Sequence, residues 1–158
     1  MYSTLVILHL LAAVSWVGGM IFLSLVLAPL VRGRKAAPEF MALFRSAALR
    51  FRPIVWISIA ILLTTGPMLL SQQGLSVMNP AAWPGIVTMK LSLVGLLLFL
   101  TLLHDLVLGP RVSRVGAIPE SQRTAGEQVI FKTARWLPRL SLLIALAVVV
   151  AATMLARS

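Results

Sequence analysis

Four long apolar runs separated by short polar segments dominate the pattern of this sequence. These runs cover residues 5–31, 53–70, 85–108 and 140–156. Each is close to, or longer than, the ~20 residues that a helix needs to cross a bilayer. The backbone in lipid must form its hydrogen bonds internally, and the runs lack the alternation of barrel strands. The pattern predicts four transmembrane helices, at residues 3–31, 40–71, 84–108 and 128–157.

The composition supports the same class of protein. Of the 158 residues, 59% are hydrophobic and 11% are charged, whereas a soluble domain carries about 25% charged residues. The mean hydropathy is +0.99. We therefore expect an all-α integral membrane protein that forms a single transmembrane domain over residues 1–158.

The basic residues predict the orientation of the helices. Twelve of the 14 Lys and Arg residues lie in residues 32–52 and 109–139, whereas the connection at 71–84 has none. Basic loops stay in the cytoplasm. The sequence thus predicts a multi-pass protein of a bacterial-type inner membrane, folded as an up-down bundle with both termini outside. The net charge of +10 lies mostly in these loops, as expected for a protein in a lipid bilayer. We therefore expect no nucleic-acid partner.

Few polar side chains inside the predicted spans can carry chemistry. They are His9, Lys90, His104 and Asp105, and the chain has no cysteine. His9 and Lys90 lie about two turns from the outer ends of their helices, whereas His104 lies 14 residues beyond Lys90, or ~21 Å along a helix. One chain therefore cannot bring both histidines to a single metal.

His9, Lys90 and His104 are candidate cofactor-binding residues, and the last two also have structural alternatives. His104 can sit at the membrane interface, and Lys90 can extend its ammonium to the headgroups. His9 has no acid at its depth, which favours a ligand role, with Met68 or Met89 as a soft second ligand for copper. Lys90 is the candidate catalytic residue, as a proton carrier or a charge partner.

The remaining candidates are residues that can surround a cofactor. Trp16 and Gly19 follow His9 on the first helix and serve either packing or a flat cofactor. At the cytoplasmic end, Arg52, Arg135 and Arg139 contact either anionic headgroups or carboxylates such as porphyrin propionates.

Several short motifs resemble a known family. The run from His9 through Trp16 to Gly18-Gly19, followed by Pro29, resembles the first helix of CopD-like copper-resistance membrane proteins and of HemJ-type protoporphyrinogen oxidases. Further matches are Thr65-Gly66, Lys90, His104-Asp105 and Gly109-Pro110-Arg111. The resemblance implies a helical bundle that handles haem b or copper. It also implies that His9 and Lys90 are functional. The chain lacks the aromatic-rich segment that follows the third helix in HemJ-type proteins.

Three functions follow as hypotheses. The first is a haem-b-binding membrane protein with a redox role, linked to quinone, which leaves open whether the chain is an oxidoreductase. The second is a copper transport or resistance component with a periplasmic copper-binding partner. The third is a non-catalytic assembly subunit. A site shared across a homodimer is a further alternative.

Overall fold

The computed structural model describes residues 2–32, 38–116 and 122–156, and every regular element in these ranges is a helix. Some helical residues are described by their backbone alone. They are Arg32, Pro38, Ser113, Gly116, Phe131, Lys132 and Arg135. Two other predicted loop cations, Arg34 and Lys35, lie outside the described residues. The chain divides into two compact units, Met1–Pro84 and Gly85–Ser158.

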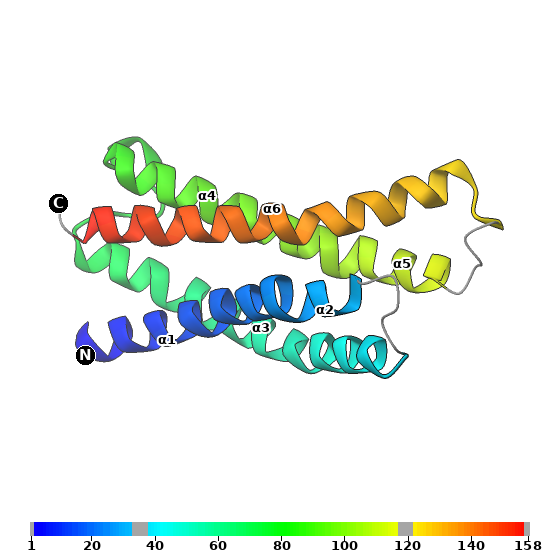
Figure 1. Cartoon of the computed structure of the whole chain (residues 1–158). Helices are drawn as coiled ribbons and strands as arrows, with labels where there is room; N and C mark the ends of the chain where they lie inside the picture. The colour runs from blue at the N-terminus through cyan, green and yellow to red at the C-terminus, as the bar shows by residue number, and fades with distance from the viewer. Residues whose placement is uncertain (1, 33–37, 117–121, 157–158) are drawn as a thin grey trace. The chain divides into compact units, whose positions relative to one another are not determined.

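The first unit is a pair of long helices. Its first arm consists of α1 (Tyr2–Ile21), the π-helix η1 (Phe22–Leu27) and α2 (Ala28–Arg32). Its second arm is α3 (Pro38–Gln72), which packs along α1 (Figure 1). Ala12 and Trp16 of α1 and Ser58 and Thr65 of α3 are at most 5% exposed. These spacings of four and seven residues place each pair on one helical face.

The second unit has the same order of elements. Its first arm consists of α4 (Gly85–Leu102), the π-helix η3 (Leu103–Leu108) and α5 (Gly109–Gly116). Its second arm is α6 (Ala125–Leu155), which packs against α4 and α5 (Figure 1). Leu97 and Ala145 are among its most buried residues.

The prediction of four membrane-length helices is confirmed within the described residues. Four helices are long and apolar enough to cross a membrane, over Tyr2–Val31, Glu39–Gln72, Gly85–Val112 and Trp136–Leu155. Their outward faces carry large apolar side chains, such as Val14, Ile57 and Leu143, each at least 60% exposed. Such faces are compatible with contact to lipid tails.

Two helix boundaries differ from the sequence prediction by more than two residues. The last helix begins at Ala125, three residues earlier than expected, because Thr124 and Glu127 form a capping box. The Thr124 backbone N–H donates to Glu127 Oε2 at 2.7 Å, and the Glu127 N–H donates to Thr124 Oγ1 at 3.4 Å, which satisfies two terminal donors. The third predicted helix continues past residue 108, as η3 and α5, to Gly116.

The connection between the two units is closed by local hydrogen bonds. Gly74 ends the turn after α3 with a φ of +75°, a conformation that glycine adopts without steric cost. A short 3₁₀-helix, η2 (Pro80–Ala82), follows. The indole N–H of Trp83 donates to the Ser76 carbonyl oxygen at 2.8 Å, which folds the connection back on itself.

Candidate functional site

A short polar contact in the first unit joins the two long helices at His9. His9 Nδ1 lies 2.7 Å from Thr65 Oγ1, and this oxygen lies 2.6 Å from the carbonyl oxygen of Ile61, one turn earlier in α3. The Thr65 side chain is 5% exposed. Breaking this contact would leave a buried polar atom without a partner, which costs free energy.

The two hydrogen bonds together favour one position for the proton on the His9 ring. A threonine hydroxyl has one hydrogen, and the Thr65 hydroxyl donates it to the Ile61 carbonyl oxygen. Toward His9 the same oxygen can therefore only accept, so the Nδ1–H of His9 donates to it. In the neutral ring the lone pair then lies on Nε2. This is the tautomer that a metal ligand needs when Nε2 is the binding atom.

The ring of His9 also lies against the backbone of α3. A Cβ atom built on Gly66 would be 3.7 Å from His9 Cε1, an ordinary van der Waals distance. Thr65 holds the ring by a hydrogen bond, and one edge of the ring lies beside Gly66. The residues that the sequence singled out separately, His9 and the Thr65-Gly66 pair, thus meet in the structure.

Other residues predicted for the first helix have packing partners. Trp16, seven residues after His9, is 4% exposed. At Gly19 the space is taken by Phe51 of α3, because a Cβ atom on Gly19 would overlap the Phe51 ring. Gly18 is different, since a Cβ there would meet nothing within 4 Å. Gly19 therefore lets α1 and α3 approach closely at this level.

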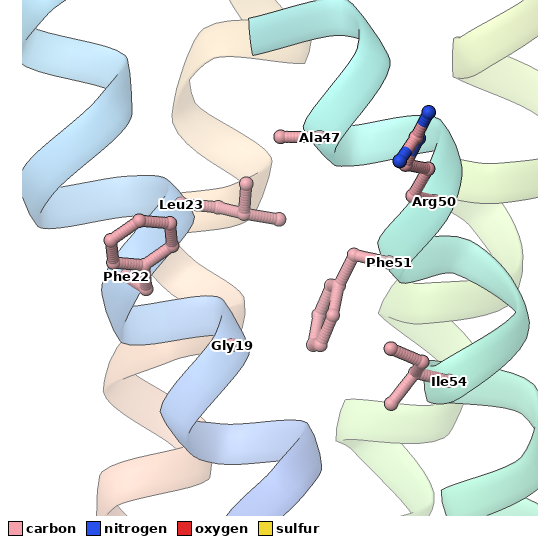
Figure 2. Close-up of a pocket in the computed structure, with 7 residues that line it drawn as sticks. All are labelled: Gly19, Phe22, Leu23, Ala47, Arg50, Phe51 and Ile54. Carbon is pink, nitrogen blue, oxygen red and sulfur yellow. The ribbon is translucent and has the colours of Figure 1, made fainter. Parts of the chain in front are cut away.

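An apolar pocket of about 220 Å³ lies beside Gly19 and Phe51, between the two arms of the first unit. Figure 2 shows its walls, with Phe51 and Ile54 of α3 pointing toward the helix that carries Gly19, Phe22 and Leu23. Ala47 and Arg50 complete the lining, and Arg50 is its charged residue. Gly19 lies ten residues after His9, ~15 Å along a helix. The pocket is therefore a separate place from the His9 contact.

Arg52, the predicted arginine of the first unit, does not lie close to His9. Arg52 is exposed on α3, 13 residues before Thr65 and so ~20 Å along the helix from the His9 contact. Within the second unit, the guanidinium of Arg139 lies 4.8 Å from the ring centroid of Trp136, a cation–π contact. The side chain of Arg135 lies outside the described residues.

The remaining predicted residues lie in α3, α4 and η3. Met68 lies three residues after Thr65, on the same side of α3, and is 47% exposed. Lys90 and Met89 lie in α4, and His104 is exposed in η3, so all three belong to the second unit. Among the described residues, no three His, Cys, Asp or Glu side chains come together as a metal-binding group.

The hydrogen bond from His9 to Thr65 was not predicted from the sequence. Its signal was a hydroxyl residue next to a glycine inside an apolar span, at the depth of the histidine. Comparisons with models of protein families, with curated proteins and with solved structures find no match to the chain.

Proposed function

We propose that the chain is a haem-b-binding integral membrane protein with a redox role, in which His9 supplies an axial ligand. The observation that carries the proposal is the hydrogen-bonded chain from His9 Nδ1 through Thr65 Oγ1 to the Ile61 carbonyl oxygen. Histidines that bind metals usually donate their other ring N–H to an oxygen, which fixes the tautomer and the ring orientation. His9 meets this requirement within one helix pair.

The residues of the first unit suit a bound haem in three respects. His9 would hold the iron through Nε2, Thr65 would orient the ring, and the apolar side chains along α1 and α3 would limit access of water. A bound haem supplies one-electron chemistry, with a potential that depends on the ligand and its hydrogen bonds. The contact between His9 and Thr65-Gly66 also supports the proposed kinship with CopD-like and HemJ-type proteins, because it joins two of their motifs.

Quinone and Lys90 complete the proposal. A membrane quinone is the proposed electron partner, and the apolar pocket lined in part by Arg50 could receive its apolar ring. We assign Lys90 as a charge partner or proton carrier, as the resemblance implies.

Copper is the second candidate, and the position of Met68 favours it. Met68 follows Thr65 by one turn on α3, and Thr65 contacts His9. A neutral imidazole and a thioether are ligands that suit Cu(I). In this alternative His9 and Met68 bind the ion.

Thr65 provides a direct test of the observation. We expect Thr65→Val to lower the affinity for haem about 10–100-fold, the usual cost of losing the partner of a metal-binding histidine. Thr65→Ser keeps a hydroxyl and should retain most of the affinity. Thr64→Val is the matched control, because the Thr64 hydroxyl bonds to the backbone at Ala60 and Ile61. Titration of each purified apoprotein with haem, followed by absorption, measures the effect. Wild-type affinity in Thr65→Val would refute the orienting role.

We also propose that the four spans alternate in direction as an up-down bundle with both termini outside the cytoplasm. The support is the basic residues of the segments 32–52 and 109–139. Reporter fusions at Gly74 and Ser158 should be active outside, and fusions at Lys35 and Glu120 should be active in the cytoplasm. A cytoplasmic report from Gly74 would reverse the proposed orientation.

A further inference from the structure

Both units contain a π-helix at the same place in their first arm. The π-helix η1 covers Phe22–Leu27, and η3 covers Leu103–Leu108, so the two have the same length and can be aligned from end to end. The bonds that end the two π-helices also correspond. Ala28 N–H donates to the Leu23 carbonyl oxygen, and Gly109 N–H donates to the His104 carbonyl oxygen. Well under about 1% of residues in globular proteins are in π-helices, so this agreement is not expected by chance.

The sequence around the two π-helices is also shared. Residues 25–29 read Leu-Val-Leu-Ala-Pro, and residues 106–110 read Leu-Val-Leu-Gly-Pro. Proline alone does not explain the π-helices. Pro53, Pro67 and Pro138 each lie inside an α-helix that continues without one. The unusual backbone therefore accompanies the whole motif.

The resemblance of the units extends beyond the motif. In each, the arm with the π-helix is followed by a long α-helix that contains a proline, Pro53 in α3 and Pro138 in α6. When the alignment of the π-helices is extended toward the N-terminus without a gap, Trp16 falls opposite Leu97. Both residues are buried, at 4% and 2% exposure. The order of elements, the backbone anomaly and this buried position all follow one alignment.

We propose that the second unit is a repeat of the first, with the first arms aligned without a gap so that η3 lies opposite η1. In this alignment Lys90 occupies the position of His9, and Leu100 occupies the position of Gly19. Aligning Pro138 with Pro53 places Val150 opposite Thr65. At the positions equivalent to His9 and Thr65, the second unit therefore has neither a histidine nor a hydroxyl group. If His9 binds haem as proposed above, the repeat gives each chain one histidine ligand site, in the first unit. Lys90 is then the residue of the second unit that is equivalent to His9.

Scanning with nitroxide side chains tests the repeat without reference to any cofactor. The chain has no cysteine, so single cysteine substitutions label uniquely. Collision with oxygen would be measured at every position of 18–31, of 99–112 and of a control window, 46–59, that contains Pro53. Variants that elute as the wild type does in gel filtration would be scored, in lipid vesicles.

The expected profiles follow from the hydrogen-bond pattern. A π-helix adds a residue to the turn, so the 3.6-residue period of accessibility should break within 22–27 and within 103–108. The two profiles should superimpose when Phe22 is set opposite Leu103, and the control window should keep its period through Pro53. An unbroken period in either window, or better agreement in another register, would overturn the repeat. Absence of haem would refute the proposed function but leave this result unaffected.

Discussion

Replacing His9 by alanine is expected to remove haem binding from the purified protein. The variant lacks the Nε2 lone pair that would bind iron, and no other histidine is present in the first unit. Affinity should fall by at least about 100-fold, beyond the loss expected for Thr65→Val. Absorption after haem is supplied measures the effect, because bound haem b gives a Soret band.

Two variants distinguish ligand loss from misfolding. His9→Gln keeps a side chain that can hydrogen-bond to Thr65 but offers a poor ligand, and it should lose the Soret band while eluting normally in gel filtration. His104→Ala should keep the band, since His104 is exposed in η3. Equal loss of haem from the His9 and His104 variants would contradict a single site in the first unit.

The second large effect concerns the stability of the helix pair. Gly19→Ala should destabilise the protein by about 1–3 kcal/mol, the usual cost of forcing extra atoms into a packed contact. The reason is that a Cβ atom on Gly19 overlaps the ring of Phe51. Thermal unfolding in detergent would show the loss as a lower Tm.

The neighbouring glycine provides the control. Gly18→Ala adds the same methyl group where nothing lies within 4 Å, so its Tm should stay equal or rise, since alanine favours helix. Phe51→Leu combined with Gly19→Ala should recover part of the loss, because the smaller side chain leaves room. Additive effects of the two substitutions would contradict a direct contact between Gly19 and Phe51.

The apolar runs predicted the helices because any segment that crosses lipid must form its backbone hydrogen bonds internally, whatever its detailed sequence. The boundaries depended on local chemistry instead. Thr124 and Glu127 start α6 by a capping box, a motif readable from the sequence but hidden by the polar residues that follow it. The π-helices were not predicted. Almost every position in these spans is apolar, so the sequence pattern does not show where the helical period shifts by a residue.

The candidate site was predicted in part. His9 stood out because a histidine inside an apolar span needs a partner, but the partner was unknown. Thr65 lies 56 residues away, and only the packing of α1 on α3 brings the two together. The structure does not bring Arg52 to His9, because the helical rise separates them by ~20 Å. Spacing along one helix could be computed from the sequence, whereas contacts between helices could not.

The central claim is that the chain binds haem b through His9, and the cofactor content of the purified wild-type protein tests it most directly. Porphyrin and copper would be quantified in the same sample, purified from cells supplied with both, and the absorption spectrum would be recorded. The proposal predicts one haem b for each chain, a Soret band and no stoichiometric copper. Stoichiometric copper without porphyrin would contradict it in favour of the site at His9 and Met68, and the absence of both would contradict it in favour of an assembly role.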